Sequence, residues 1–112
     1  MFDVLIINGN LVDGTGKKAS KADIGIIADK IDQIGNLKDA SAKKIIDATG
    51  KTLSPGFIDT HAHSDAALLI DPIHENGIRQ GITTEILGQD GLSYAPLSKE
   101  NYLLNKRYLA GI

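Results

Sequence analysis

The sequence predicts a mixed α/β chain, with an antiparallel β module over residues 1–54 and a strand–helix–strand unit after it. Three observations support this class. In the first half, short apolar runs alternate with Gly, Asn and Asp turns, as in small antiparallel sheets. The pair Pro55-Gly56 then punctuates the chain. Beyond it, apolar strands flank a helical segment, which is typical of a parallel βαβ unit.

The composition is that of an ordinary globular chain and excludes several function classes. The apolar fraction of 42% comes with a net charge of −2 and no tryptophan, which argues against a nucleic-acid partner. The apolar runs are too short to span a bilayer, and the N-terminus lacks the features of a signal peptide. The absence of cysteine excludes disulfides and thiolate ligands. It is compatible with a cytoplasmic location, which we expect.

The first apolar run covers residues 4–7, and Leu11-Val12 resumes it. Asn8-Gly9 lies between them, and an Asn-Gly pair in this setting is the strongest short-range hairpin signal, because both turn residues take positive φ. We therefore expect a hairpin turn at Asn8-Gly9. A second turn is expected at residues 13–16, which read Asp-Gly-Thr-Gly.

Three more strands are expected in this half, over residues 22–28, 31–34 and 45–48. The first two are joined by a turn at residues 29–30. The polar stretch at 35–44 predicts a connecting loop. Most lysines of the chain lie in this half, and we interpret them as a solvated outer face.

The second half opens with a predicted buried strand that contains Phe57 and Ile58 and runs into His61-Ala62-His63. Side chains two residues apart on a strand point to the same side, so the two histidines should face together, with Asp59 beneath them. Two imidazoles on one face can bind the same ion, and zinc takes such nitrogens at about 2.0–2.1 Å. The spacing therefore indicates a metal site.

A helix is expected to follow. Residues 66–70 are apolar without a clear period, so their state is open. Asp71-Pro72 is a good helix start, since Asp can cap and Pro suits the first helical position. The helix should run to about Gln80 and end at Gly81. His74 on this helix is expected to be a surface or packing residue.

Residues 82–87 are rich in β-branched side chains and predict the next strand, which leads into a glycine-flanked loop carrying Asp90. Ser98 should cap a closing helix that Gly111 ends. In parallel α/β folds, ligands gather at the carboxyl ends of the strands. His61, His63 and Asp90 all lie at such ends, so the topology predicts that they meet.

These residues resemble a known family. The run Ser-Pro-Gly-Phe-Ile-Asp-Thr-His-Ala-His at residues 54–63 is similar to the first barrel strand of the amidohydrolase superfamily, and residues 3–16 resemble its N-terminal β domain. The segment 81–93 is similar to the N-acyl-D-amino-acid deacylases, or D-aminoacylases. The resemblance implies a β-sandwich module over residues 1–54. It also implies that residues 55–112 are the first strands and helices of a (β/α)8 TIM barrel, truncated here.

By this resemblance, His61, His63 and Asp90 are the metal ligands of the chain. The better-known deacylases carry cysteine where this sequence has Asp90, in a Gly-Asn-Cys-Gly context. A carboxylate is a harder ligand than a thiolate, so the metal's identity and number stay open. We expect one or two Zn²⁺ ions, with other divalent metals as alternatives.

The implied reaction is hydrolysis of the amide bond of an N-acyl-D-amino acid, giving a D-amino acid and a carboxylate. A metal ion would activate water and polarise the acyl carbonyl. The general-base aspartate and the remaining histidine ligands would come from later strands, so no catalytic residue is expected within these 112 residues, which alone should be inactive. The partners are then the substrate and the rest of the barrel. Asp59 and Asp65 are candidates for orienting the imidazoles, and Glu85 has no assigned role.

Other functions compete with this interpretation. Within the enzymes, the alternative is a cyclic amidohydrolase (a hydantoinase or dihydroorotase) or a deaminase. Dihydroorotases usually place arginine two residues after the second histidine, where this chain has Asp65, which argues against that branch. From another class, the alternative is a non-catalytic metal-binding or assembly module.

Overall fold

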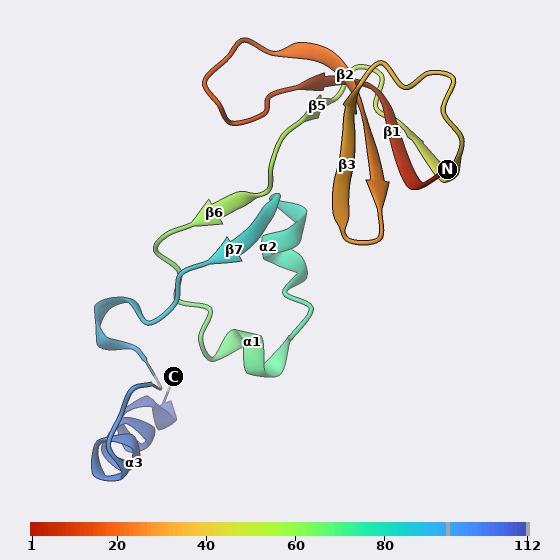
Figure 1. Cartoon of the computed structure of the whole chain (residues 1–112). Coiled ribbons are helices and arrows are strands. Elements are labelled where there is room, and N and C mark those ends of the chain that lie inside the picture. Colours follow the sequence, from red (N-terminus) through yellow and green to blue (C-terminus); the bar gives the residue numbers. More distant parts are fainter. Residues whose placement is uncertain (94, 112) are drawn as a thin grey trace. The chain divides into compact units, whose positions relative to one another are not determined.

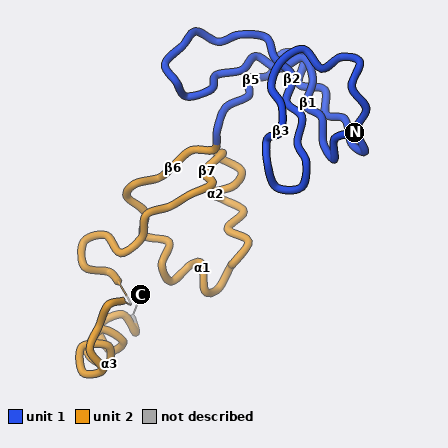
Figure 2. The backbone as a smooth tube through the Cα atoms, viewed as in Figure 1, with its two compact units in different colours: residues 1–55 blue, residues 56–112 orange. Residues whose placement is uncertain are grey.

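The computed structural model describes residues 1–93 and 95–111 of the chain. These form a mixed α/β structure of two compact units, Met1–Pro55 and Gly56–Ile112 (Figure 2). Unit 1 consists of strands and turns. Unit 2 combines two strands with short helices (Figure 1).

Unit 1 is one twisted sheet with strand order β3-β2-β1-β4, and β5 also pairs with β1. Its strands are β1 (Phe2–Leu11), β2 (Ser20–Ile27), β3 (Lys30–Gly35), β4 (Ala42–Asp47) and β5 (Thr52–Leu53). The predicted antiparallel pairing holds for β1, β2 and β3. However, β4 and β5 run parallel to β1, so the sheet is mixed.

The hairpin predicted at Asn8-Gly9 is wrong, because β1 runs straight through these residues. Asn8 alone takes a positive φ, of 63°, and the pairing with β2 shifts register between Ile6 and Gly9. The pair therefore forms a bulge rather than a turn. A side chain at Gly9 would meet Leu53, since an added Cβ would lie 2.2 Å from its Cδ1 atom. The glycine thus permits the close approach of β5.

The core of unit 1 contains Phe2, Leu5 and Leu37, which are buried against one another. A buried carboxylate, Asp23, lies beside them and is 5% exposed. Its two oxygens accept hydrogen bonds at 2.8 Å from the backbone amides of Asn8 and Leu37. A buried charge needs such donors, and here they connect the β1 bulge to the segment after β3.

Unit 2 begins with two parallel strands, β6 (Phe57–Asp59) and β7 (Ile82–Glu85), which confirms the predicted parallel pairing. Both strands are shorter than expected. The expectation of a buried strand is wrong for the described residues, since Phe57 and Ile58 are 60% and 63% exposed. With β7 as the strand paired to β6, much of this apolar surface is left uncovered.

The connection between these strands holds two short helices, α1 (Ala67–Ile70) and α2 (Glu75–Arg79). The helix expected from Asp71-Pro72 therefore starts three residues late. His74 has φ 50° and ψ 48°, which is a left-handed conformation that an α-helix cannot contain. Asp71 instead accepts a hydrogen bond from the amide of Ile73 in a local turn. Gly81 does end the segment, with φ 81°.

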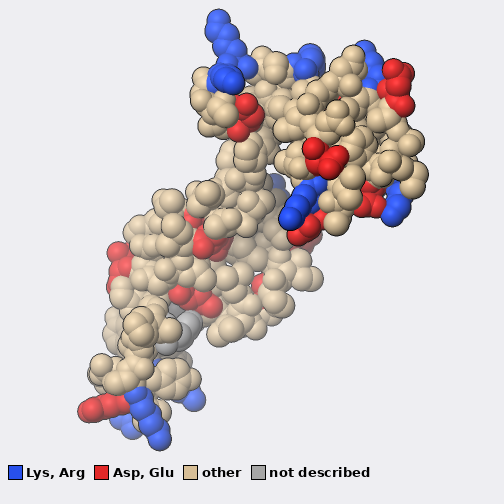
Figure 3. Space-filling model, in the orientation of Figure 1, with Lys and Arg blue, Asp and Glu red and all other residues tan. Residues whose placement is uncertain are grey.

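The last elements are η1 (Gln89–Gly91), α3 (Lys99–Tyr108) and η2 (Leu109–Gly111). Ser98 caps α3 as predicted, its hydroxyl accepting a hydrogen bond from the amide of Asn101. No helix among the described residues is long and apolar enough to cross a bilayer. On the face of the molecule drawn in Figure 3, acidic and basic side chains are interspersed over unit 1.

Candidate metal centre

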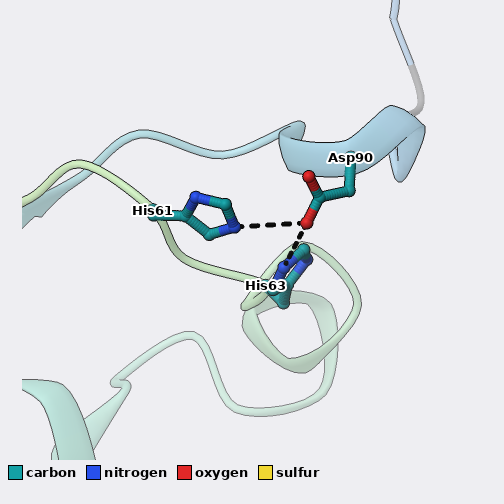
Figure 4. Close-up of side chains that lie close together, drawn as sticks. All are labelled: His61, His63 and Asp90. Atoms are coloured by element: carbon teal, nitrogen blue, oxygen red, sulfur yellow. Dashed lines mark hydrogen bonds and ion pairs between the residues drawn. The ribbon is translucent and has the colours of Figure 1, made fainter.

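Three side chains of unit 2 converge on one point: His61, His63 and Asp90 (Figure 4). The Oδ2 atom of Asp90 lies 3.2 Å from Nε2 of His61 and 3.3 Å from Nε2 of His63. The imidazole rings are nearly perpendicular, with an interplanar angle of 68° and centroids 5.3 Å apart. The sequence singled out these three residues, and the topology does bring them together.

The separations suit the ligand shell of a metal ion. Two ligands that each lie about 2.0–2.1 Å from a tetrahedral zinc ion are about 3.3 Å apart. The two nitrogen–oxygen distances of the triad are close to this value. The side chains are 59%, 45% and 66% exposed, so an ion can reach them. Two imidazoles and a carboxylate are a donor set that fits zinc and other divalent first-row metals.

The end of β6 positions the histidines. Asp59 is the last residue of the strand, and its Oδ1 atom accepts a hydrogen bond of 3.0 Å from the backbone amide of His61. The contact turns the chain out of the strand, so both histidines follow the strand rather than belong to it. The predicted alternation of a strand is therefore not what makes them converge. Asp59 binds the backbone of His61, whereas we expected it to orient an imidazole.

A glycine-flanked turn positions Asp90. Asp90 has φ 55°, and Gly88, two residues before it, and Gly91, directly after it, both have φ 80°. Aspartate is one of the few side-chain-bearing residues that adopt this left-handed conformation readily. The turn follows the backbone hydrogen bond of 2.8 Å from the amide of Ile86 to the carbonyl of Asp59. The loop thereby starts where β6 and β7 are still paired.

Two side chains next to the triad connect its two segments. Oδ1 of Asp65 accepts a hydrogen bond of 3.2 Å from the amide of Gly88. Nε2 of Gln89 donates to the carbonyl of Thr60 at 3.2 Å. Asp65 was expected to orient an imidazole, but it contacts the backbone of the opposite loop instead. Gln89 could not be predicted from sequence, because an amide side chain in a glycine-rich turn carries no distinctive sequence signal.

A second polar pair of unit 2 lies between α2 and β7. Nε2 of His74 is 2.7 Å from Oε1 of Glu85, and the side chains are 25% and 11% exposed. Oε2 of Glu85 is buried without a hydrogen-bond partner among the described residues. Gly77 faces the pair, and an added Cβ there would lie 2.5 Å from Cδ2 of His74. The sequence predicts His74 only as a surface or packing residue and assigns no role to Glu85, because the left-handed turn at His74 leaves no sequence pattern.

The chain matches known proteins across this site. The model of the Amidohydrolase family matches residues 44–109. The D-aminoacylase of Alcaligenes xylosoxydans xylosoxydans is 42% identical over 100 residues, which are 89% of this chain and 21% of that protein. The chain thus spans about one fifth of the length of the curated relatives it matches.

Solved structures of deacylases also resemble this chain. A D-aminoacylase structure, described as having a binuclear metal centre with one-metal activation and second-metal attenuation, superposes with a TM-score of 0.81 at 42% identity, covering 87% of this chain and 20% of that one. The N-acyl-D-glutamate deacylase of Bordetella bronchiseptica, complexed with zinc and a phosphonate mimic of the tetrahedral intermediate, superposes with a TM-score of 0.79 at 39% identity. The overlap covers 86% of this chain and 21% of that one.

Proposed function

The chain belongs to the amidohydrolase family, and on that premise we propose that it is the N-terminal part of a metal-dependent N-acyl-D-amino-acid deacylase. The observation that carries the proposal is the convergence of His61, His63 and Asp90, with nitrogen–oxygen separations of 3.2 and 3.3 Å. We assign these residues as metal ligands, with Zn²⁺ as the ion. The names of the deacylase relatives support the substrate class.

In this proposal, unit 2 contributes the first two strands of a (β/α)8 barrel, and unit 1 is the β module that accompanies it. The ligands lie at the carboxyl ends of β6 and β7, which is where barrel enzymes build their active sites. When bound, a zinc ion lowers the pKa of water and polarises the acyl carbonyl. The residues of this chain hold and orient that ion. The proton transfer to the leaving amine belongs to groups outside these 112 residues.

The proposal is tested with the full-length protein and with both enantiomers of an N-acyl amino acid. The protein should release D-amino acids from N-acyl-D-amino acids and act much more slowly on the L-enantiomers. Chelation of the metal should abolish turnover, and added Zn²⁺ should restore it. Hydantoin as an alternative substrate separates the deacylase from a cyclic amidohydrolase. Turnover of hydantoin without turnover of N-acyl-D-amino acids, or full activity in metal-free protein, would contradict the proposal.

The same experiment tests the non-catalytic alternative. A binding or assembly module would take up Zn²⁺ at His61 and His63 and hydrolyse neither class of substrate. His61→Ala is the matched variant, because it removes one proposed ligand and leaves the rest of the chain unchanged. In a deacylase, this variant should lose bound metal and turnover together.

A further inference from the structure

The proposed ligands come from two separate segments. His61 and His63 follow β6, and Asp90 lies in the loop that follows β7. All three side chains are largely exposed, so packing does not fix their positions. Nε2 of His61 does lie within hydrogen-bond distance of Oδ2 of Asp90, at 3.2 Å, but an exposed contact of this kind contributes little to stability. We therefore expect groups around the ligands to help set the separation of the two segments.

Gln89 bridges the two segments through its side-chain amide. It precedes Asp90 in the chain, and its Nε2 atom donates to the carbonyl of Thr60, the residue before His61, at 3.2 Å. The same nitrogen donates to the carbonyl of Ile86, also at 3.2 Å. Both hydrogens of the amide group are thus used. The side chain is half-buried, in contrast to Asp90 beside it.

Asp65 forms a second bridge between the segments. It lies two residues after His63, and it accepts the amide hydrogen of Gly88, two residues before Asp90, at 3.2 Å in a half-buried setting. A carboxylate is a stronger acceptor for such an amide than a neutral oxygen. The two bridges run in opposite directions. Gln89 reaches from the Asp90 loop to the histidine segment, and Asp65 reaches back.

We propose that Gln89 and Asp65 are positioning residues of the metal site, which act by holding the Asp90 loop against the histidine segment. The inference rests on the proposed role of His61, His63 and Asp90 as metal ligands. The side chains that converge are those of His61, His63 and Asp90. By contrast, Oδ1 of Asp65 and Nε2 of Gln89 bind backbone atoms of the opposite segment. Their effect is to preassemble the ligands, so that an ion binds without first ordering the loop.

The expected consequence is a loss of metal affinity when either bridge is broken. Outer-shell partners of metal ligands typically change affinity by about 10–100-fold. We expect about 10-fold weaker Zn²⁺ binding for each bridge, because the bridges act on backbone neighbours of the ligands. The two losses should be less than additive, since both bridges restrain the same loop.

The variants are chosen to break a hydrogen bond without changing size. Gln89→Glu replaces the amide donor by a carboxylate, which would face the carbonyl oxygens of Thr60 and Ile86. Its matched control is Gln80→Glu, because Gln80 makes the same type of contact, to the carbonyl of Asn76 at 3.1 Å, away from the triad. Should Gln89→Glu not fold, Gln89→Met removes the donors without adding charge and carries the same expectation.

Asp65 is tested with a pair of variants that separate hydrogen bonding from charge. Asp65→Ala removes the acceptor and should weaken Zn²⁺ binding. Asp65→Asn keeps an oxygen that can accept from the amide of Gly88, so it should restore most of the affinity. The control is Asp71→Ala, which removes an exposed aspartate that binds only a neighbouring amide, that of Ile73.

The measurement is the dissociation constant of Zn²⁺ from the full-length apo-protein, by competition with a chromophoric chelator, together with the Co²⁺ absorption spectrum and the apo-protein melting temperature. We expect weaker binding and an altered spectrum in Gln89→Glu and Asp65→Ala, at control-like melting temperatures. Affinity within about twofold of the controls would overturn the proposal. An Asp65→Asn variant as weak as Asp65→Ala would overturn it for Asp65. If His61→Ala left Zn²⁺ binding unchanged, the metal site itself would be wrong.

Discussion

Asp90 combines two properties that substitutions can separate. Its backbone adopts φ 55°, and its carboxylate lies next to both histidines. Alanine at such a φ is strained, by about 1–2 kcal/mol, so Asp90→Ala changes the loop as well as the ligand. Asparagine tolerates the same conformation but offers a neutral oxygen, which makes it the matched variant for the ligand role.

We predict that Asp90→Asn lowers the Zn²⁺ affinity and the turnover of the full-length protein together, by about 10–100-fold or more. The melting temperature of the apo-protein should change little. Asp90→Cys should retain metal and partial activity, because thiolate is a good zinc ligand at about 2.3 Å. Metal analysis beside a deacylation assay checks both variants. Full metal content and undiminished turnover in Asp90→Asn would reduce Asp90 to a turn residue.

The lowered pKa of Asp47 predicts how the stability of unit 1 depends on pH. Hydrogen bonds from the Asn8 amide group, and then from the hydroxyl and backbone amide of Thr49, hold the pKa of Asp47 below its ordinary value of 3.8. Because the fold favours the ionised form, the stabilisation is complete above that ordinary value and is lost as the pH falls through the lower pKa of the folded state. The pKa of Asp3 is lowered as well, by a hydrogen bond from the Ala28 amide and then by Lys43. Hydrogen bonds from Thr15 lower the pKa of Asp13.

We therefore expect the protection factors of the β1 amides in the full-length protein, which correct exchange rates for the intrinsic effect of pH, to fall below pH 3.8. Asp47→Asn should flatten this pH dependence. Hydrogen exchange measured across that range is the test, because it reports unit 1 separately. Asp39→Asn, at an exposed position of the same unit, is the control. Equal pH profiles for Asp47→Asn and the unsubstituted protein would contradict the assignment.

At the residue scale, the sequence was informative where chemistry depends on residue type. The identities of His61, His63 and Asp90, and their places after two predicted strands, were enough to group them. What the sequence could not reveal was the set of contacts that depend on backbone conformation. The contact of Asp65 with Gly88 and the turn at His74 follow from left-handed residues and loop paths that leave no periodic pattern.

At the scale of elements, α2 is connected to β7 by a small polar cluster. The His74 ring lies over Gly77 and reaches Glu85, so the N-cap and first turn of α2 share one partly buried space with β7. Interiors are tightly packed, and an extra methyl group in such a place typically costs about 1–3 kcal/mol. The left-handed backbone of His74 ends the helix on its N-terminal side and accompanies the contact with Glu85.

We predict that Gly77→Ala destabilises the full-length protein by about 1–3 kcal/mol, although alanine is the better helix former. The loss should largely disappear in the background of His74→Ala, which empties the space that the new Cβ would enter. A double-mutant cycle from chemical denaturation measures this coupling. Additive effects of the two substitutions would show that the ring and the glycine do not share this space.

The elements also show which local sequence signals predict structure correctly. Ser98 and Gly81 acted as the sequence predicted, because a helix cap and a helix stop depend on one or two neighbouring residues. Asn8-Gly9 did not, because β4 pairs with β1 before the bulge, and β2 and β5 pair with it beyond the bulge. The same contacts explain why the sheet is mixed. Parallel pairing of β1 with distant strands is a tertiary property that local turn signals do not encode.

At the scale of the whole molecule, unit 2 exposes apolar side chains that a folded enzyme would cover. Phe57 and Ile58 on β6, and Ile70 and Ile73 in the connection, are 60–86% exposed. Burying one such side chain stabilises a protein by about 1.5–3 kcal/mol. A barrel would also pair the free edges of β6 and β7. The proposed barrel therefore accounts for a surface that these 112 residues leave open.

We predict that the 112-residue chain alone associates in solution and is inactive, since unpaired strand edges and apolar patches promote association. Light scattering after size-exclusion chromatography measures the associated mass across a range of concentrations. A monodisperse monomer that unfolds cooperatively would count against the prediction and would mean that unit 2 is stable without further strands.

In the proposed site, His61, His63 and Asp90 bind one metal ion together. Anomalous diffraction from crystals of the full-length protein, recorded on both sides of the zinc absorption edge, would locate this ion. We predict an anomalous peak within about 2.0–2.2 Å of a nitrogen of each histidine and an oxygen of Asp90. A zinc peak bound elsewhere, or one that leaves Asp90 beyond bonding distance, would contradict it.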